Sequence, residues 1–280
     1  MGEDEDPSFE TPLRKAAKEN NIQQVKTLIM NGAEIDAGSL YKRTALHFAA
    51  KYGHEEMVEL LIENGAKVNA KSISKDIPLH FAAENGNRAI VSMLLQKGAE
   101  VNAKGSCGYL PLHYASNSDQ ADIIEILLQN GSKIDEKDVN GCTPLHRAAS
   151  SNSFLSVKVL LRAGANIDAE CLNLETPLHK AAKNGNFDSV EILVQKGANL
   201  DGALHFASSK PIVDILLEHG MDIEEKRGLY QEYTPLHSVT NKGFHEAVQA
   251  LISRGANIEA NNFEGYTPLH LAVDRGKLFL

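Results

Sequence analysis

The sequence contains no tryptophan, and aromatic residues make up only 6% of its 280 residues. A core without large rings has to be built from aliphatic side chains. Cysteine is also scarce, since Cys107, Cys142 and Cys171 are the only three and none shares a Cys-x-x-Cys spacing. An odd number of cysteines without ligand-like spacing argues against a disulfide framework and a structural zinc site. We interpret them as surface thiols.

A basic excess and a long apolar run are absent as well. Lys and Arg total 28 against 37 Asp and Glu, for a net charge of -9. This balance argues against nucleic-acid binding, because phosphate contacts need concentrated Lys and Arg. No segment approaches the roughly 18 apolar residues of a membrane-spanning helix, so this segment is not expected to insert into a membrane. The start also lacks the basic and then apolar order of a secretion signal. We therefore expect a soluble protein of a reducing compartment and a cytoplasmic location.

The sequence is an array of repeats. The tetrapeptide Thr-Pro-Leu-His occurs intact four times, and variants of it occur at five further places. The starting positions are Thr11, Thr44, Ile77, Leu110, Thr143, Thr176, Gly202, Thr234 and Thr267. Successive starts are 33 residues apart five times, and then 26, 32 and 33 residues apart. A period this regular identifies a repeat architecture.

Each repeat predicts two short helices. Thr is a good N-cap and Pro suits the first helical position, so the opening starts the first helix. Nine residues after the start stands a residue that tolerates a positive φ angle, such as Gly53 or Asp119, and ends this helix in a tight turn. A second helix follows with helical apolar spacing, as at Val58 and Leu61, and it closes at a glycine such as Gly65.

This pattern resembles the ankyrin repeat family. The matching features are the opening Thr-Pro-Leu-His-x-Ala, the 33-residue period and the ending Gly-Ala-x-Val/Ile-Asn/Asp-Ala, seen at residues 65–70 and 164–169. The resemblance implies an all-α fold, an α-solenoid of stacked helix-turn-helix repeats with projecting β-hairpin loops. It covers residues 7–280 and leaves residues 1–6 as an acidic leader.

Two repeats depart from the pattern. The seventh lacks seven residues between Gly197 and Gly202, and the turn between its two helices is shortened. Two interpretations stay open: decay of one repeat, or a kink that divides a block of six repeats from a block of three. The ninth repeat stops at Leu280 before its second helix. From this we infer a fragment or truncated form of a longer array, because terminal repeats normally carry a polar cap.

The eleven histidines do not form a catalytic or metal-binding pattern. Eight of them occupy the fourth place of the opening, at His47, His80, His113, His146, His179, His205, His237 and His270. At this place the resemblance implies a structural role, in which the imidazole bonds to the backbone and ties hairpin to helix. No phosphate-binding glycine loop, Gly-x-Ser-x-Gly elbow or His-Glu-x-x-His motif occurs. We therefore expect no enzymatic activity, no cofactor and no metal.

The resemblance also implies where a partner binds, namely at the hairpin tips and the end of the first helix, along a concave surface. Applied to this sequence, it selects Leu40, Tyr41, Arg43, Lys51, Tyr52, Ile73, Asp76, Tyr109, Tyr230, Tyr233, Phe263 and Tyr266. Six of the seven tyrosines are among them, and tyrosine offers a large contact area with few rotatable bonds. For Tyr109, Tyr233 and Tyr266, packing on the neighbouring hairpin is an equal alternative.

We predict a non-catalytic adaptor or scaffold that binds a protein partner as a monomeric array. The alternative is a recognition arm of a larger protein, such as a channel, a ubiquitin ligase, a bacterial effector or a pore-forming toxin, since the family occurs in these settings. An enzyme with an unmarked active site is a third hypothesis. The resemblance implies one modification as well: asparagine in the Gly-Ala-x-Val-Asn ending is hydroxylated in some family members, and Asn69 and Asn102 match.

Overall fold

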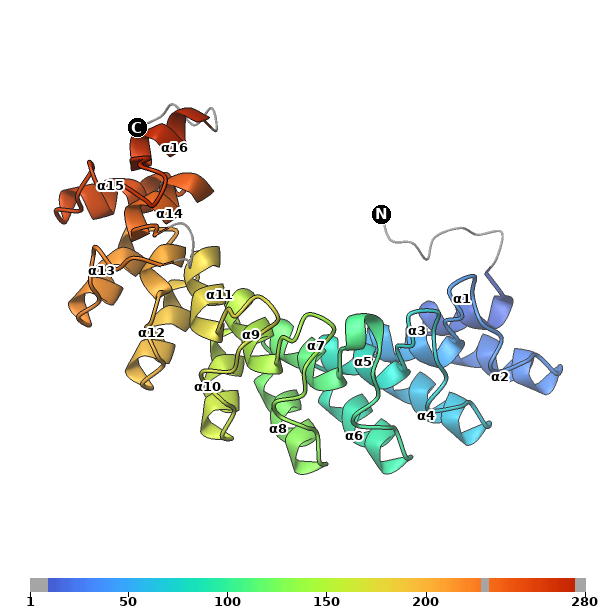
Figure 1. Cartoon of the computed structure of the whole chain (residues 1–280). Helices are drawn as coiled ribbons and strands as arrows, with labels where there is room; N and C mark the ends of the chain where they lie inside the picture. The colour runs from blue at the N-terminus through green and yellow to red at the C-terminus, as the bar shows by residue number, and fades with distance from the viewer. Residues whose placement is uncertain (1–9, 228–231, 275–280) are drawn as a thin grey trace. The chain divides into compact units, whose positions relative to one another are not determined.

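The computed structural model describes residues 10–227 and 232–274, which form two compact units. The N-terminal unit comprises the residues up to Pro144 together with Lys158–Ala165. The C-terminal unit comprises Leu145–Val157 together with the residues from Asn166 onward. Each unit is a stack of helix pairs joined by turns and loops (Figure 1). The acidic leader expected at residues 1–6 lies outside the described residues.

In the N-terminal unit, two rows of helices lie side by side (Figure 1). The first helices of the repeats are α1 (Pro12–Lys18), α3 (Ala45–Tyr52), α5 (Pro78–Glu84) and α7 (Pro111–Asn117). The second helices are α2 (Ile22–Met30), α4 (Glu55–Glu63), α6 (Arg88–Gln96) and α8 (Ala121–Gln129). Each first helix contacts the first helix of the next repeat, and α6 contacts both α4 and α8. The predicted solenoid is confirmed.

The C-terminal unit repeats this arrangement. Its first-helix row consists of α11 (Pro177–Asn184), the short 3-10 helix η3 (Ala203–Phe206), α14 (Pro235–Lys242) and α16 (Pro268–Asp274). Its second-helix row consists of α12 (Phe187–Gln195), α13 (Lys210–Glu218) and α15 (His245–Ser253). Contacts join α12 to α13 and α13 to α15. Two further helices, α9 (Pro144–Ser150) and α10 (Phe154–Arg162), carry residues of both units.

The predicted start and stop signals act as expected. At α11, the Thr176 side chain accepts a hydrogen bond from the His179 N–H, and Pro177 occupies the first helical position. The helix ends at Gly185, whose φ of 78° lies in the left-handed region. At the corresponding turn of an earlier repeat, Asp119 takes a φ of 56°. A short polar residue and a glycine thus serve the same turn, because both tolerate this conformation.

The core lies between neighbouring helix pairs and is aliphatic, as the shortage of aromatics predicted. Leu46, Leu79 and Leu112, which stand one repeat apart on successive first helices, are fully buried. The alanines Ala82 and Ala115 on the same helices are fully buried too, and their small side chains allow α5 and α7 to pack closely. Each fully buried leucine contributes about 1.5–3 kcal/mol to folding, so stacking supplies the stability that a single pair lacks.

The projecting loops are hairpins closed by a few backbone hydrogen bonds. In the second repeat, for example, the Ser39 N–H donates to the Arg43 carbonyl at 2.8 Å. Within the described ranges, the loops contain no β-strand, and one isolated antiparallel bridge joins Arg227 and Tyr233. The loops also bond to each other, since the Ile73 N–H donates to the Tyr41 carbonyl of the preceding loop at 2.8 Å.

The seventh repeat does not interrupt the stack. Its first helix is reduced to η3, which contacts α11 on one side and α14 on the other. The repeat therefore lies inside the C-terminal unit, and the structure does not divide six repeats from three at this point. Its second helix, α13, carries Pro211 in its first turn as predicted. The ninth repeat provides α16, and the apolar end of the chain lies outside the described residues.

Candidate interaction surface

The repeated histidines fasten each loop to the helix beside it. In His47, Nδ1 accepts a hydrogen bond from the Thr44 N–H at 3.0 Å, and Nε2–H donates to the carbonyl of Asp76 in the next loop at 3.1 Å. His113 makes the same pair of bonds, to the Leu110 N–H and the Cys142 carbonyl. The structure therefore shows the structural role that the resemblance implied.

These rings are poorly suited to proton transfer near neutral pH. Burial lowers the pKa of His47 to about 4, because the charged ring would lose its hydration. Burial also lowers the pKa of His205 to about 4, with Arg227 and Lys242 nearby adding to the effect. A general acid or base works best with a pKa near the working pH. The histidines thus belong to the framework.

The hairpin tips expose apolar side chains. Leu40 and Ile73 are each 57% exposed at the tips of two adjacent loops, and Phe263 is 74% exposed in the last loop. These three predicted residues lie where a partner can reach them. The predicted set omits Val139 and Leu172, which are equally exposed. All five stand four residues before the start of a repeat, and this recurring apolar position was the signal that could have added Val139 and Leu172 to the predicted set.

Three predicted tyrosines pack against the repeated histidines. The Tyr109 ring stacks on His113 with 5.4 Å between centroids, and Tyr233 stacks on His237 at 5.5 Å. Tyr266 is tilted against His270 at 5.9 Å. These rings thus pack on the framework histidine of their own repeat, whereas the alternative expected them to pack on the neighbouring hairpin. Tyr266 remains about half exposed, whereas Tyr109 and Tyr233 are half-buried.

The second repeat presents a mixed aromatic and basic group at the end of α3. Tyr52 is 43% exposed, and its ring stacks on His54 with 6.0 Å between centroids. The Lys51 ammonium lies 5.8 Å from the centre of the Tyr52 ring. Arg43 places its guanidinium 5.0 Å from the Phe81 ring, and Tyr41 is half-buried in the loop beside it. The remaining predicted residue, Tyr230, lies outside the described residues.

Asp76 requires a correction, because it is buried and not a surface contact. Asp76 is only 4% exposed. The carboxylate accepts a hydrogen bond from the Ser106 N–H and another from the Tyr114 hydroxyl, each at 2.9 Å. Both donors come from the following repeat, so Asp76 joins neighbouring repeats. Burial, and then the negative charge of Asp76, raise the pKa of Tyr114 above its usual range.

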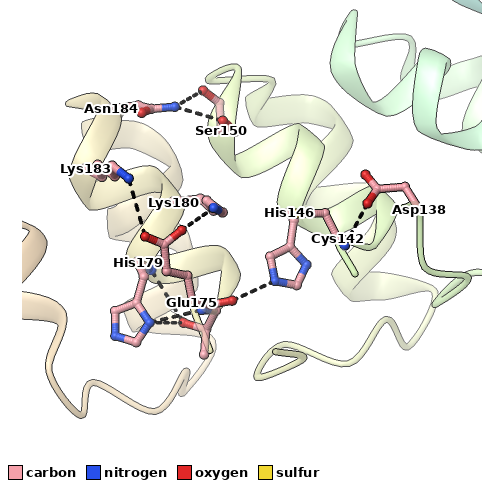
Figure 2. A network of polar contacts seen from close by, with 10 residues as sticks. Asp138, Cys142, His146, Ser150, Glu175, His179, Lys180, Lys183 and Asn184 are labelled. Atoms are coloured by element: carbon pink, nitrogen blue, oxygen red, sulfur yellow. Dashed lines mark hydrogen bonds and ion pairs between the residues drawn. The ribbon is translucent and has the colours of Figure 1, made fainter. Parts of the chain in front are cut away.

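A polar network in the C-terminal unit was not predicted. Glu175, just before α11, is 7% exposed and receives ion pairs from Lys180 and from Lys183, the latter at 3.4 Å (Figure 2). Burial opposes the ionisation of Glu175, but hydrogen bonding by Lys180 and the charges of both lysines hold its pKa below the usual range. Its backbone carbonyl accepts the Nε2–H of His146 at 3.0 Å. Glu175 thereby ties two repeats together.

Lys242, the last residue of α14, extends this basic group. Its ammonium donates to the His205 carbonyl at 2.7 Å and lies 4.4 Å from the centre of the Phe206 ring. Its pKa is lowered to about 8, first by burial and then by the positive charge of Lys183, while Glu175 opposes the shift.

The remaining candidate sites can be placed as follows. Cys107 is exposed, but Cys142 and Cys171 are buried, so the surface-thiol interpretation is wrong for those two. In the part of the chain that the structure describes, no three His, Cys, Asp or Glu side chains are grouped closely enough to hold a metal ion. Over the same residues, every helix is too short or too polar to span a bilayer.

The two candidate hydroxylation sites bridge neighbouring repeats at their loop bases. The Asn69 amide donates to the Gly98 carbonyl at 2.9 Å, and its side-chain oxygen accepts from the Glu100 N–H at 2.9 Å. Asn102 makes the equivalent bonds one repeat later, to Gly131 and Lys133. Asp36 and Asp168 hold the same position in other repeats and make only the acceptor bond, from the Lys67 and Asn199 N–H groups, so the donor bond is specific to the two asparagines.

Comparison with known proteins agrees with this architecture. A family model described as ankyrin repeats in three copies matches residues 2–72, 79–171, 112–203, 164–227 and 204–279. Among solved structures, the human ASB11 ankyrin repeat domain superposes with a TM-score of 0.69 at 32% sequence identity. The match covers 76% of this chain and 99% of that domain.

Curated relatives match over shorter segments. Human Rabankyrin-5 is 34% identical over 76 residues, and alpha-latrotoxin-Lhe1a of Latrodectus hesperus is 37% identical over 70 residues. These segments are 24% and 25% of this chain, but only 6% and 5% of the two relatives. The chain thus matches a small part of much longer proteins. With the family model covering nearly all of its length, the chain belongs to the ankyrin repeat family.

Proposed function

We propose that this protein is a non-catalytic adaptor or scaffold that binds a protein partner through its hairpin tips and the ends of its first helices. The ankyrin repeat fold is typically a non-catalytic interaction scaffold, and ankyrin repeats generally bind proteins. The framework of this chain uses its recurring histidines for loop attachment, as described above. The surface on which binding would depend is therefore the variable part of each repeat.

The observation that carries the proposal is the row of exposed apolar side chains at one repeat position. In the N-terminal unit, Leu40, Ile73 and Val139 are each more than half exposed. Backbone hydrogen bonds join these loops to the preceding loops. The Val139 N–H donates to the Cys107 carbonyl at 3.0 Å, and the Ile73 N–H donates to the Tyr41 carbonyl. Loops whose backbones are bonded to each other lose less backbone entropy on binding, which favours contact with a partner.

A triple variant tests this surface. Leu40→Ser, Ile73→Ser and Tyr52→Ala together remove exposed apolar area without opening the core. We expect partner capture by the variant to fall by about tenfold or more, which corresponds to the loss of over about 1.4 kcal/mol of binding energy. The melting temperature should stay close to that of the wild-type chain.

A matched control uses Met30→Ser, because Met30 is 78% exposed at the end of a second helix, away from the hairpins. Quantitative mass spectrometry of captured proteins compares the three chains. Equal capture by the triple variant and the wild type would count against the proposal.

The second candidate function is the recognition arm of a larger protein. It is favoured by the comparisons, because the matched segments are only 5–6% of two long curated relatives. The mass of the full gene product in its native source separates the two candidates. A mass near 30.5 kDa, that of this chain, would contradict the second candidate.

Three finer properties belong to the same proposal. We infer that the array works as a monomer in the cytoplasm, which light scattering and cell fractionation test.

We also infer that Asn69 and Asn102 are hydroxylation substrates, because each stands at the repeat base beside an exposed loop. Incubation with an asparaginyl hydroxylase should add the mass of one oxygen atom to each tryptic peptide. The Asn69→Gln and Asn102→Gln chains should show no gain at the substituted site.

A further inference from the structure

The shortened seventh repeat changes the first-helix row of the C-terminal unit. Its neighbours α11 and α14 each have eight residues, whereas η3 between them has four. The first-helix row is therefore one turn short at this repeat. Lys242 reaches from α14 across the end of η3, where its ammonium donates to the His205 carbonyl at 2.7 Å. The Phe206 ring lies beneath it, 4.4 Å from the ammonium.

Positive charge gathers around this short repeat. Lys180, Lys183 and Lys242 contribute three ammonium groups beside the Glu175 carboxylate, while Arg227 at the same repeat is paired with Asp201 and Glu225. The ion pairs of Glu175 go to Lys180 and Lys183, so the carboxylate is already shared by two lysines. The hydrogen bond of Lys242 goes to a neutral carbonyl. The Lys183 side chain is 43% exposed and can be reached from solvent.

We propose that this basic site binds an acidic side chain of a peptide segment of the partner. Lys183 and Lys242 would pair with the incoming carboxylate, and the Phe206 ring would contact the aliphatic part of the same side chain. The inference rests on the proposed function, since it assumes that the first-helix surface is used for protein binding. It adds the chemistry of the partner: an aspartate or glutamate in an extended segment.

The physical reason to expect an acidic side chain is the balance of charge at the site. A partly desolvated lysine beside a second lysine gains more from a carboxylate than an exposed lysine does, because the interaction is weakly screened. The protein as a whole carries a net charge of -9, which disfavours a long polyanion such as nucleic acid. A single acidic residue would pair with the two lysines without bringing many negative charges to an acidic protein.

A random peptide library displayed on phage tests the proposal with the full chain as target. We expect the enriched peptides to contain an aspartate or glutamate that cannot be replaced by asparagine or glutamine. Their affinity for the Lys183→Gln/Lys242→Gln chain should fall by about tenfold or more, the effect expected for losing close charge pairs. Circular dichroism and thermal unfolding verify that this variant is folded.

The matched control is the Lys97→Gln/Lys196→Gln chain. It changes the net charge by the same amount, at exposed lysines that end second helices. Peptides that bind this control as weakly as the test variant would overturn the proposal, and so would enrichment of peptides without acidic residues or no enrichment at all. Peptides lost on the Leu40, Ile73 and Tyr52 variant but kept on the lysine variant would overturn the acidic site while supporting the hairpin surface.

Discussion

Acidification to pH 5 should destabilise this protein through histidines such as His47. The ring is 1% exposed, and its Nδ1 faces the Thr44 N–H, so a proton there would replace a hydrogen bond by repulsion. The pKa of His47 is about 4 in the folded chain and about 6.5 in an unfolded one. Because the folded-state pKa is the lower one, the unfolded chain takes up the proton first as the pH falls.

The size of the effect follows from these two pKa values. The stabilisation by neutral His47 is present above about pH 6.5 and is lost as the pH falls toward 4. Between pH 7 and pH 5 the loss is about 2 kcal/mol for this one residue, at about 1.4 kcal/mol for each pKa unit. His205, whose pKa is also about 4, should add to the loss in the C-terminal unit.

Urea unfolding followed by circular dichroism at pH 7, 6 and 5 measures this loss. The His47→Gln chain lacks the titrating ring, so its free energy of unfolding should fall by about 2 kcal/mol less than that of the wild type over the same interval. The control His245→Gln replaces an exposed histidine outside the repeated opening and should follow the wild type. Parallel curves for His47→Gln and wild type would refute the reasoning.

Three further predictions concern the framework and the basic site. Gly105→Ala should lower stability by about 1–3 kcal/mol in urea unfolding, because the added Cβ would clash with the Asp76 carboxylate oxygen; an unchanged midpoint would contradict the close contact. Amide hydrogens of residues 198–212 should exchange faster than those of the regular repeats, since a four-residue 3-10 helix replaces a full α-helix there; equal protection in exchange mass spectrometry would argue otherwise. Lys183→Gln should raise the pKa of Lys242 by removing a nearby positive charge, and NMR titration of the lysine side chain would show a constant value if the two charges do not interact.

Repeat boundaries, helix starts and turns could be read from the sequence because they depend on neighbouring residues. A threonine accepts the N–H of the residue three places on, as at Thr176, and a glycine such as Gly185 can take the positive φ that a tight turn requires. The histidine role also came from the family resemblance, and its Nδ1 bond spans only three residues. Local chemistry of this kind repeats whenever the motif repeats.

The sequence by itself determined the array and the recurring apolar tip position, although the partner set drawn from it was incomplete. Only the tertiary structure decided which variable residues reach solvent, because that depends on the next repeat. Asp76 looks like a surface residue in the sequence, yet Ser106 and Tyr114, which follow it by 30 and 38 residues, surround its carboxylate. The proposed basic site depends on the fold in the same way, since α11 and α14, which carry Lys183 and Lys242, both pack against η3 of the short repeat.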